Sequence, residues 1–155
     1  MPLKPCKKKN YLAMIENAAK GQNWMFRNFY VTEDGIEKDV LSDGRWSCAA
    51  FVSSVLCLNK LIGDVHANVG STERDMLASG WYEIKDLRPG AVLIWEKRLG
   101  DDDGEPHAHN GFYVGGDMAI SNSSKQTGFP WKHHYTYDNT RKIEKIYWHS
   151  ALDED

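Results

Sequence analysis

Hydrophobic residues follow two different periods along this chain, helical in the first half and alternating in the second. Apolar positions recur at helical spacing over residues 11 to about 21, which predicts a first helix that stops at a glycine. A stronger apolar run predicts a second helix from residue 46 or 47 to about 62, followed by Gly63. A short third helix is predicted from residue 71 or 72, its N-cap, to residue 78.

The second half consists of short segments rich in β-branched and aromatic residues, separated by turns that contain glycine or proline. Residues 31 to 45, between the first two helices, are polar and are interpreted as a loop. Helices first and a meander of strands later indicate an α+β fold, with N-terminal helices packed on an antiparallel sheet of about five to six strands. The expected strands are WYEI, AVLIWE, HNGFYVG, MAISNSS, KHHYTY and IEKIYWH.

The length of 155 residues suits one domain that buries a core without disulfides. A hydrophobic content of 41% and six tryptophans are typical of a folded globular protein. We therefore expect a single domain over residues 11 to 150, preceded by a basic flexible tail over residues 1 to 10.

The formal net charge of -3 gives no overall basic field, so nucleic acid is not an expected partner. No apolar run approaches membrane-spanning length. The basic N-terminus is followed by Glu16, Asn17 and Lys20 instead of an unbroken apolar stretch, which predicts the absence of a Sec signal. We expect a protein that is cytoplasmic as synthesised, with export only by a non-classical route such as phage lysis or injection as an effector.

Two of the three cysteines lie in RWSCAAFVSSVLCLNKL, residues 45 to 61. Cys48 and Cys57 are nine residues apart on the predicted helix, so they face opposite sides and are separated by about 13 Å of helix rise, too far for a disulfide. Cys57 lies among leucines and is expected to fill the core. Cys48 is at the first turn, where unpaired N–H groups and the helix dipole favour a thiolate with a lowered pKa. It is either a nucleophile or a small packing residue.

A reactive thiol needs a base, and His109 is the candidate. Alternation along HNGFYVG places His109, Gly111 and Tyr113 on one face of the predicted strand. Gly111 removes bulk beside the imidazole, which leaves room for a substrate or a helix terminus.

The group that orients His109 is sought on the following strand. A two-residue hairpin turn would pair Gly111 with Asn122 and put the amide oxygen of Asn122 one diagonal step from His109. A turn one residue longer would bring Ser121 to this face instead. We select Asn122 as the third catalytic residue and keep Ser121 as the alternative.

Three segments resemble a known family. WSCAAFVSSVL resembles the cysteine-helix motif of NlpC-type cell-wall cysteine peptidases, and LRPGAVLIW resembles their Pro-Gly turn into a core strand. HNGFYVGGDMAISNSS resembles their histidine strand and the hairpin after it. The order and spacing match over roughly residues 11 to 148, and CHAP-type amidases share a related arrangement.

This resemblance implies a papain-like core with Cys48 as nucleophile, His109 as base and a polar third residue near position 121 or 122. An ungapped match puts Ser121 there. The implied activity is hydrolysis of an amide bond in peptidoglycan-type peptides by a peptidase or amidase. The chain departs from the family pattern at Ser47, Ala49, Ala50 and Ala91.

The expected partner is accordingly a peptide or peptidoglycan fragment. We expect no cofactor, metal, nucleic acid or membrane partner, and a monomeric protein. The candidate substrate-binding residues are Ser121 and three aromatic residues, Trp46, Tyr30 and Trp131, which equally suit packing in the core or at its rim.

Two other functions compete with this interpretation. Histidines at positions 107, 109, 133 and 134, with the aspartates at 101–103, suggest a transition-metal site, but adjacent His133 and His134 face opposite ways and no set has zinc-finger spacing. The other alternative is a catalytically inactive binding module that retains the fold, which the altered residues around Cys48 favour.

Overall fold

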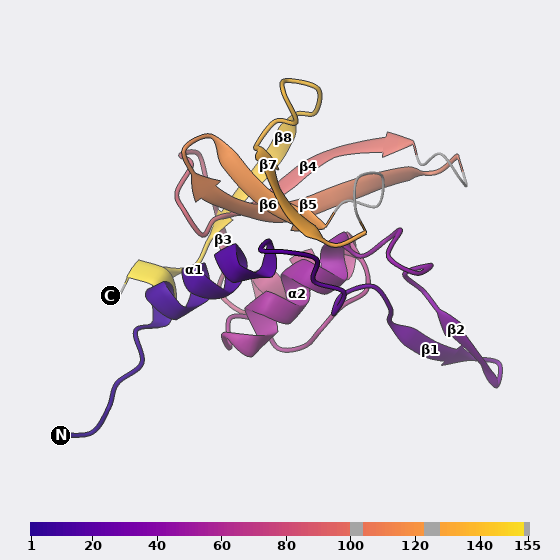
Figure 1. The fold of residues 1–155 in the computed structure, drawn as a ribbon, viewed down its shortest axis with the longest axis horizontal. Coiled ribbons are helices and arrows are strands. Elements are labelled where there is room, and N and C mark those ends of the chain that lie inside the picture. The colour runs from indigo at the N-terminus through magenta and orange to yellow at the C-terminus, as the bar shows by residue number, and fades with distance from the viewer. Residues whose placement is uncertain (100–103, 123–127, 154–155) are drawn as a thin grey trace.

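The computed structural model describes residues 1–99, 104–122 and 128–153. Within them the chain forms three α-helices, one 3-10 helix, a six-stranded antiparallel sheet and a two-stranded sheet, which confirms the α+β class. Helices α1 and α2 lie on one side of the large sheet (Figure 1). The elements are α1 (Lys7–Ala18), β1 (Tyr30–Glu33), β2 (Ile36–Asp39), α2 (Cys48–Leu58), α3 (Val69–Ala78), β3 (Tyr82–Ile84), β4 (Val92–Leu99), β5 (Pro106–Gly115), β6 (Met118–Asn122), β7 (Pro130–His134), β8 (Ile143–Trp148) and η1 (Ser150–Asp153).

The first helix begins at Lys7, inside the segment expected to be a tail. The N–H of Asn10 already bonds to the carbonyl of Cys6 at 2.9 Å. Lysine is a good helix former, and the turn is anchored by buried Tyr11, whose hydroxyl donates to the carbonyl of Gly90 at 2.7 Å. Because these first residues are mostly polar, apolar periodicity did not include them.

The segment predicted to be a loop contains a β-hairpin, so that prediction was wrong. Strands β1 and β2 pair with Tyr30 opposite Asp39. The turn residues Asp34 and Gly35 have φ values of 52° and 78°, the left-handed backbone that an Asp-Gly hairpin turn requires. Both strands are largely exposed, so they carry no alternating apolar pattern. Figure 1 shows the hairpin extending away from the large sheet.

Asp39 fastens the end of this hairpin to the segment that leads to α2. Its carboxylate accepts hydrogen bonds from the backbone N–H groups of Phe29, Leu41 and Asp43 at 2.8–3.0 Å. Although burial alone would raise the pKa of Asp39, these bonds lower it to about 2. The charged carboxylate of Asp39 thereby holds the backbone of the segment that precedes Cys48.

Helix α2 is shorter than predicted and α3 is longer. Lys60 adopts a left-handed conformation with φ of 57° and ends α2 before the expected stop at Gly63. Asn68, not Ser71 or Thr72, is the N-cap of α3, and its side-chain oxygen accepts the N–H of Ser71 at 2.8 Å. No helix in the part of the chain that the structure describes is long and apolar enough to cross a membrane.

The large sheet has the strand order β3-β8-β4-β5-β6-β7. The expected meander is confirmed from β4 to β7, where each strand pairs with its successor. The last strand departs from it, because β8 returns to lie between β3 and β4. This order makes β5 an interior strand with neighbours on both sides.

The β5–β6 hairpin has the predicted turn but not the predicted register. Gly116 and Asp117 form the turn, with φ values of 59° and 62°. A register shift just before the turn, between Tyr113 and Gly115, moves β6 by one residue. Because side chains alternate along a strand, this shift exchanges the face that each β6 residue presents.

Apolar cores lie on both faces of the sheet. The larger core joins α1 and α2 to the sheet, and Phe112 makes edge-to-face contacts there with Tyr11 and Phe51. The smaller core, on the opposite face, contains Trp95 and Tyr113. Since Phe112 and Tyr113 are adjacent on β5, the strand alternates between the cores, and its even- and odd-numbered residues face opposite ways.

Candidate active site

Cys48 is the first residue of α2 and remains partly exposed. The backbone N–H groups of Asn110 on β5 and of Ala49 reach its sulfur. Burial raises the pKa of the Cys48 thiol, and these N–H groups together with Arg141 oppose the rise only in part. The predicted lowering of this pKa was therefore wrong: at neutral pH the sulfur is a neutral thiol, because desolvation outweighs the helix terminus.

His109 lies on β5, on the face of the smaller core. Only 8% of the residue is exposed, and the Trp95 indole stacks on its ring at 5.0 Å between centroids. Burial lowers the pKa of His109 well below its usual value, and the nearby Arg141 and His133 lower it further. The imidazole is therefore neutral at neutral pH.

Two hydroxyl groups contact the Nε2 atom of His109. The Tyr137 hydroxyl is 2.7 Å away and the Ser121 Oγ is 3.1 Å away. Ser121 also lies 2.7 Å from Nε2 of His133 and 2.8 Å from the Tyr137 hydroxyl. These contacts join residues of β5, β6, β7 and the turn after β7 into one buried cluster.

Asn122 does not orient His109. The observed register pairs Phe112 with Ile120, so Ser121 takes the position beside His109, and Asn122 faces the opposite way. Both amide atoms of Asn122 are buried without a hydrogen-bond partner among the described residues. The contact that sequence pairing assigned to Asn122 is made by Ser121, the alternative that a different turn predicted.

Gly111 is required by the protein's own packing. A Cβ atom there would come within 2.8 Å of both the Ile120 carbonyl oxygen and the Ser121 Cβ, and within 2.9 Å of the Trp95 ring. The space that was expected for a substrate or a helix terminus is therefore filled by β6 and by the indole that stacks on His109.

Half-buried Arg141 contributes a positive charge to this region. Its guanidinium donates to the carbonyl oxygens of Glu96 and His107 at 2.8–3.2 Å. The charge lowers the pKa of both Cys48 and His109, which favours thiolate at the sulfur but disfavours imidazolium at the ring.

Neighbouring residues connect Cys48 with His109. The N–H that reaches the sulfur belongs to Asn110, the residue after His109. Tyr137, which bonds to the imidazole, has its pKa raised mainly by burial and further by Cys48. Among the described residues, no hydrogen bond joins the sulfur directly to the ring.

Of the aromatic candidate substrate-binding residues, Trp131 lies in the His109 cluster, whereas Trp46 and Tyr30 have no described contact with it. Trp131 pairs with Ser121 across β6 and β7, and its ring contacts His133 and Tyr137, so it belongs to the cluster. Trp46 lies next to the His107 ring, with centroids 4.3 Å apart. Tyr30 lies on the exposed hairpin, is 67% exposed, and has no described contact with the cluster.

Buried polar atoms without partners gather around the same residues. Within the described ranges, each such side chain is next in sequence to a site residue or pairs with one across the sheet. Native proteins leave few buried polar atoms unpaired, and each one calls for a physical explanation. The atoms are Ser47 Oγ, both amide atoms of Asn110 and of Asn122, and Trp131 Nε1.

The metal hypothesis gains no geometric support. In the part of the chain that the structure describes, no three His, Cys, Asp or Glu side chains are arranged to hold a metal ion. The His133 ring has no direct hydrogen bond to His109 among the described residues and is linked to it through Ser121, whereas the His134 ring accepts hydrogen bonds from Thr136. The aspartates at 101–103 lie outside the described residues.

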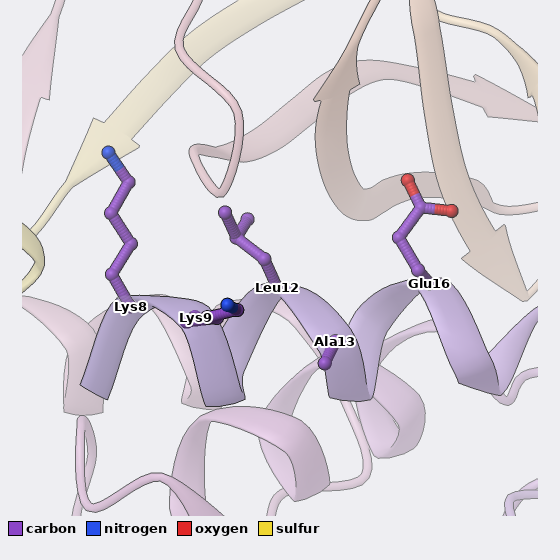
Figure 2. A pocket seen from close by; sticks show the side chains of 5 residues that line it. All are labelled: Lys8, Lys9, Leu12, Ala13 and Glu16. Carbon is purple, nitrogen blue, oxygen red and sulfur yellow. The ribbon is translucent and has the colours of Figure 1, made fainter. Parts of the chain in front are cut away.

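A surface hollow of about 400 Å³ lies elsewhere, along α1. Figure 2 shows the side chains that line it, all from one helix. It contains no thiol, imidazole or hydroxyl group, so it is not a candidate site for nucleophilic chemistry. Its lining residues are Lys8, Lys9, Leu12, Ala13 and Glu16.

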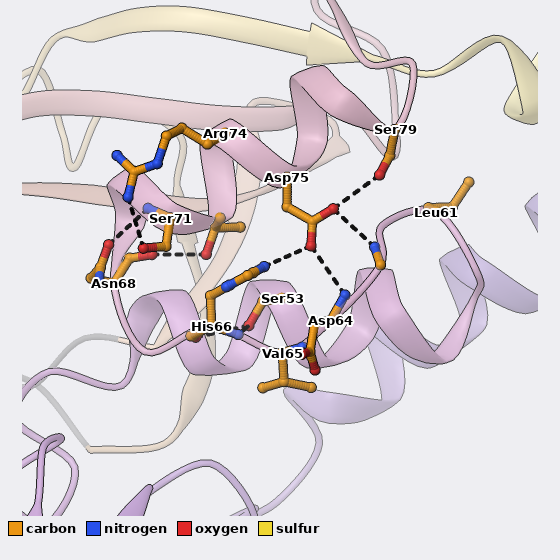
Figure 3. A network of polar contacts seen from close by, with 12 residues as sticks. Ser53, Leu61, Asp64, Val65, His66, Asn68, Ser71, Arg74, Asp75 and Ser79 are labelled. Atoms are coloured by element: carbon orange, nitrogen blue, oxygen red, sulfur yellow. Dashed lines mark hydrogen bonds and ion pairs between the residues drawn. The ribbon is translucent and has the colours of Figure 1, made fainter. Parts of the chain in front are cut away.

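A second histidine network holds the connection between α2 and α3 (Figure 3). His66 Nε2 lies 2.6 Å from the Asp75 carboxylate, which also accepts from the N–H groups of Gly63 and Asp64 and from the Ser79 hydroxyl. Burial alone would raise the pKa of Asp75, but these hydrogen bonds lower it to about 2.

Sequence reasoning did not identify Tyr137 or Arg141 as site residues, and it named His133 only as a candidate metal ligand. Alternation did imply that only one of His133 and His134 shares the face of His109. Tyr137 follows the end of β7 in a turn with φ of 53°, beyond the reach of a strand pattern. Arg141 precedes β8 and reaches the site only because that strand returns to lie beside β4.

Comparison with protein-family models, with curated proteins and with solved structures found no match to this chain.

Proposed function

We propose that the protein is a cysteine hydrolase that cleaves an amide bond, with Cys48 as nucleophile, His109 as general base and Ser121 with Tyr137 as the groups that orient the imidazole. The observation that carries this proposal is the meeting of the α2 N-terminus with β5, where the sulfur is contacted by the N–H of the residue after His109. The substrate class, a peptidoglycan-type peptide, rests on the resemblance of three sequence segments to NlpC-type peptidases.

The proposed reaction has two halves. The Cys48 sulfur attacks the carbonyl carbon while His109 accepts the S–H proton, and the C–N bond then breaks as His109 returns this proton to the leaving nitrogen. A thioester remains on Cys48. Water, deprotonated by His109, attacks the thioester; the carboxylic acid leaves, and sulfur recovers its proton from His109.

The resting charges affect how this first step proceeds. With the pKa of the thiol raised and that of the imidazole lowered, thiol and imidazole are both neutral at pH 7. Proton transfer then accompanies attack instead of preceding it. When bound substrate excludes water from the site, the charge of Arg141 would stabilise negative charge at the sulfur without further rearrangement.

Backbone N–H groups at the start of α2 are the proposed oxyanion donors. The first N–H groups of a helix have no intrahelical partner, and those of Cys48 and Ala49 already reach the sulfur. One such donor typically contributes about 10²-fold or more to the rate.

The unpaired polar atoms beside the site support a ligand-binding role. Ser47 and Asn110 flank the two reacting residues in sequence, and both are at most 1% exposed with unpaired side-chain atoms among the described residues. Violations of hydrogen-bond satisfaction are expected where function requires them. Access to the cell wall through phage lysis or injection belongs to the same proposal.

Alkylation of the three cysteines in one protein tests the thiol–imidazole pair. Iodoacetamide labelling near pH 7, followed residue by residue with mass spectrometry, compares Cys48, whose neutral thiol needs a base to react, with exposed Cys6 as an internal reference. Replacing His109 by Gln should slow Cys48 by about 10²-fold, the usual contribution of a general base, and leave Cys6 unchanged. Slow labelling of Cys48 that does not depend on His109 would contradict the proposal.

Hydrolysis is tested with purified peptidoglycan and its peptide fragments, by the release of new amino groups. Cys48→Ala should abolish release, and Cys57→Ala is the matched control, because Cys57 lies in the same helix and packs against the main core. The inactive binding module is the competing function, favoured by the neutral thiol. It predicts binding of fragments with no release of amines by the native protein.

A further inference from the structure

Three buried side chains, His109, Ser121 and His133, and half-buried Tyr137 form a connected set of hydrogen bonds in which the position of every proton can be deduced. We propose that His133 acts as a positioning residue which, through Ser121 and Tyr137, fixes His109 in the tautomer that carries its proton on Nε2 and leaves Nδ1 free to accept one. The assignment of protons rests on these contacts together with the neutral state of both histidine rings at pH 7. Its consequence, a base at Nδ1, rests on the proposed function.

The first proton is set by a backbone carbonyl. His133 Nδ1 lies 2.7 Å from the carbonyl oxygen of His134, which can only accept, so Nδ1 carries a proton. Burial lowers the pKa of His133 to about 4, so at pH 7 its ring is neutral and has a single N–H. Nε2 of His133 is therefore a hydrogen-bond acceptor.

The next two protons follow in order. Ser121 Oγ lies 2.7 Å from this acceptor and must donate its only proton to it. The Tyr137 hydroxyl, 2.8 Å from Ser121 Oγ, must then be the donor in that contact. Burial raises the pKa of Tyr137, so the phenol keeps its proton for this bond.

The last contact determines the tautomer of His109. The Tyr137 oxygen has given its proton to Ser121, so at 2.7 Å from His109 Nε2 it can only accept. Ser121 Oγ, at 3.1 Å, is likewise an acceptor. Nε2 of His109 therefore carries the proton, and because this ring is also neutral, Nδ1 carries a lone pair.

The surroundings favour neutral rings throughout. The positive charge of Arg141 lowers the pKa of His109 and so disfavours a second positive charge there. Burial is the largest effect on the pKa of His133 and lowers it; the hydrogen bond to the His134 carbonyl and the charge of Asp138 raise it, and the His134 ring lowers it. Stacking of His133 on Tyr137, with centroids 4.0 Å apart, restrains both rings in this arrangement.

Nitrogen-15 NMR of the histidine side chains tests the assignment directly in the native protein at pH 7. We expect opposite tautomers for the two rings: His109 protonated on Nε2 and His133 protonated on Nδ1, each as a single form. A His109 ring protonated on Nδ1, or a mixture of tautomers, would overturn the inference. This measurement does not depend on any variant folding.

A variant pair tests the role of His133. His133→Phe keeps an aromatic ring at the stacking position but removes the acceptor, so the Ser121 proton can turn toward His109 Nε2. We expect loss of the single His109 tautomer in this variant. His134→Ala keeps the carbonyl that bonds to His133, so it should leave His109 unchanged; a pure Nε2–H tautomer in both variants would show that His133 does not position His109.

The two proposals fail in different ways. If Cys48 labelling does not depend on His109 while His109 has the expected tautomer, the hydrolase proposal fails and the positioning role of His133 stands. If Cys48 labelling depends on His109 but the native ring is a mixture of tautomers, the positioning role fails and the hydrolase proposal stands.

Discussion

The protein holds two histidines in hydrogen-bonded networks on different parts of the fold, His66 between α2 and α3 and His109 on β5. Nε2 of His66 meets a carboxylate, that of Asp75, and these side chains are 23% and 16% exposed. Nε2 of His109, a residue that is 8% exposed, meets two neutral hydroxyl groups, those of buried Ser121 and half-buried Tyr137. Both rings are oriented, but only the first has an ionised partner.

This difference separates two uses of an oriented histidine. The ionised Asp75 carboxylate ties the loop after α2 to α3 through charge-assisted hydrogen bonds. Hydroxyl partners hold a ring in place without favouring its charged form. Burial keeps His109 neutral, as the proposed attack by a neutral thiol requires, while the His66 network contributes to stability.

The largest expected effect is that the two networks lose their contributions to the free energy of unfolding over different pH ranges. Because the pKa of His133 is about 4 in the folded protein and about 6.5 when unfolded, the unfolded chain binds more protons between these values, so stability falls as pH drops through this range. His133 alone accounts for about 3 kcal/mol of this loss, and His109 adds to it. The stabilising contribution of Asp75 is lost at lower pH, as the pH falls from about 4 toward about 2.

Urea unfolding at a series of pH values measures this separation. In His133→Phe, the loss of unfolding free energy between pH 7 and pH 4 should be smaller by about 3 kcal/mol than in the native protein, and the loss below pH 4 should be unchanged. Equal unfolding free energies at pH 7 and pH 4.5 in the native protein would contradict a buried, neutral histidine cluster.

The difference between the networks also marks what the sequence could predict. Six strands followed from alternating β-branched and aromatic residues, and Cys48 at the start of α2 followed from the polar loop before an apolar run. These features are local. The α+β class then followed from the order of the elements.

The contacts of the candidate site depend on features without a local signal. A register shift between Tyr113 and Gly115 exchanges Asn122 for Ser121 beside His109, and no residue pattern announces it. The return of β8 between β3 and β4 brings Arg141 to the site. The raised pKa of Cys48 was missed because sequence shows the helix terminus but not the burial that outweighs it.

A pair of glycines sharpens the comparison through packing. An alanine Cβ at Gly111 would lie 2.8 Å from β6 backbone, whereas at Gly63 the nearest atom, of the Asp75 carboxylate, is 3.4 Å away, an ordinary contact. Neither glycine has positive φ. We expect Gly111→Ala to lower the unfolding free energy by roughly 2 to 3 kcal/mol and Gly63→Ala by less than about 0.5 kcal/mol.

Urea denaturation of both variants checks the difference, and Cys48 labelling of Gly111→Ala shows whether displaced packing at Trp95 also disturbs His109. A stability of Gly111→Ala equal to that of Gly63→Ala would mean that β6 and Trp95 do not lie against β5 as described.

The smallest of these effects comes from removing the charge in the His66 network. Asp75→Asn keeps the shape of the side chain but exchanges an ionised acceptor of four hydrogen bonds for a neutral amide. Its stabilisation corresponds to the shift of its pKa to about 2, so we expect a loss of about 2 kcal/mol at pH 7 and little difference from the native protein below pH 2. Asp86→Asn, at a carboxylate that is 62% exposed, is the control and should change stability by less than about 0.5 kcal/mol.

Cys48 labelling in the folded Asp75→Asn variant tests whether the two networks are independent. Since Asp75 lies outside the His109 cluster, the labelling rate should be unchanged. A slower rate would mean that the two networks are coupled through α2, which carries both Cys48 and Ser53, and Ser53 exchanges hydrogen bonds with the backbone of His66.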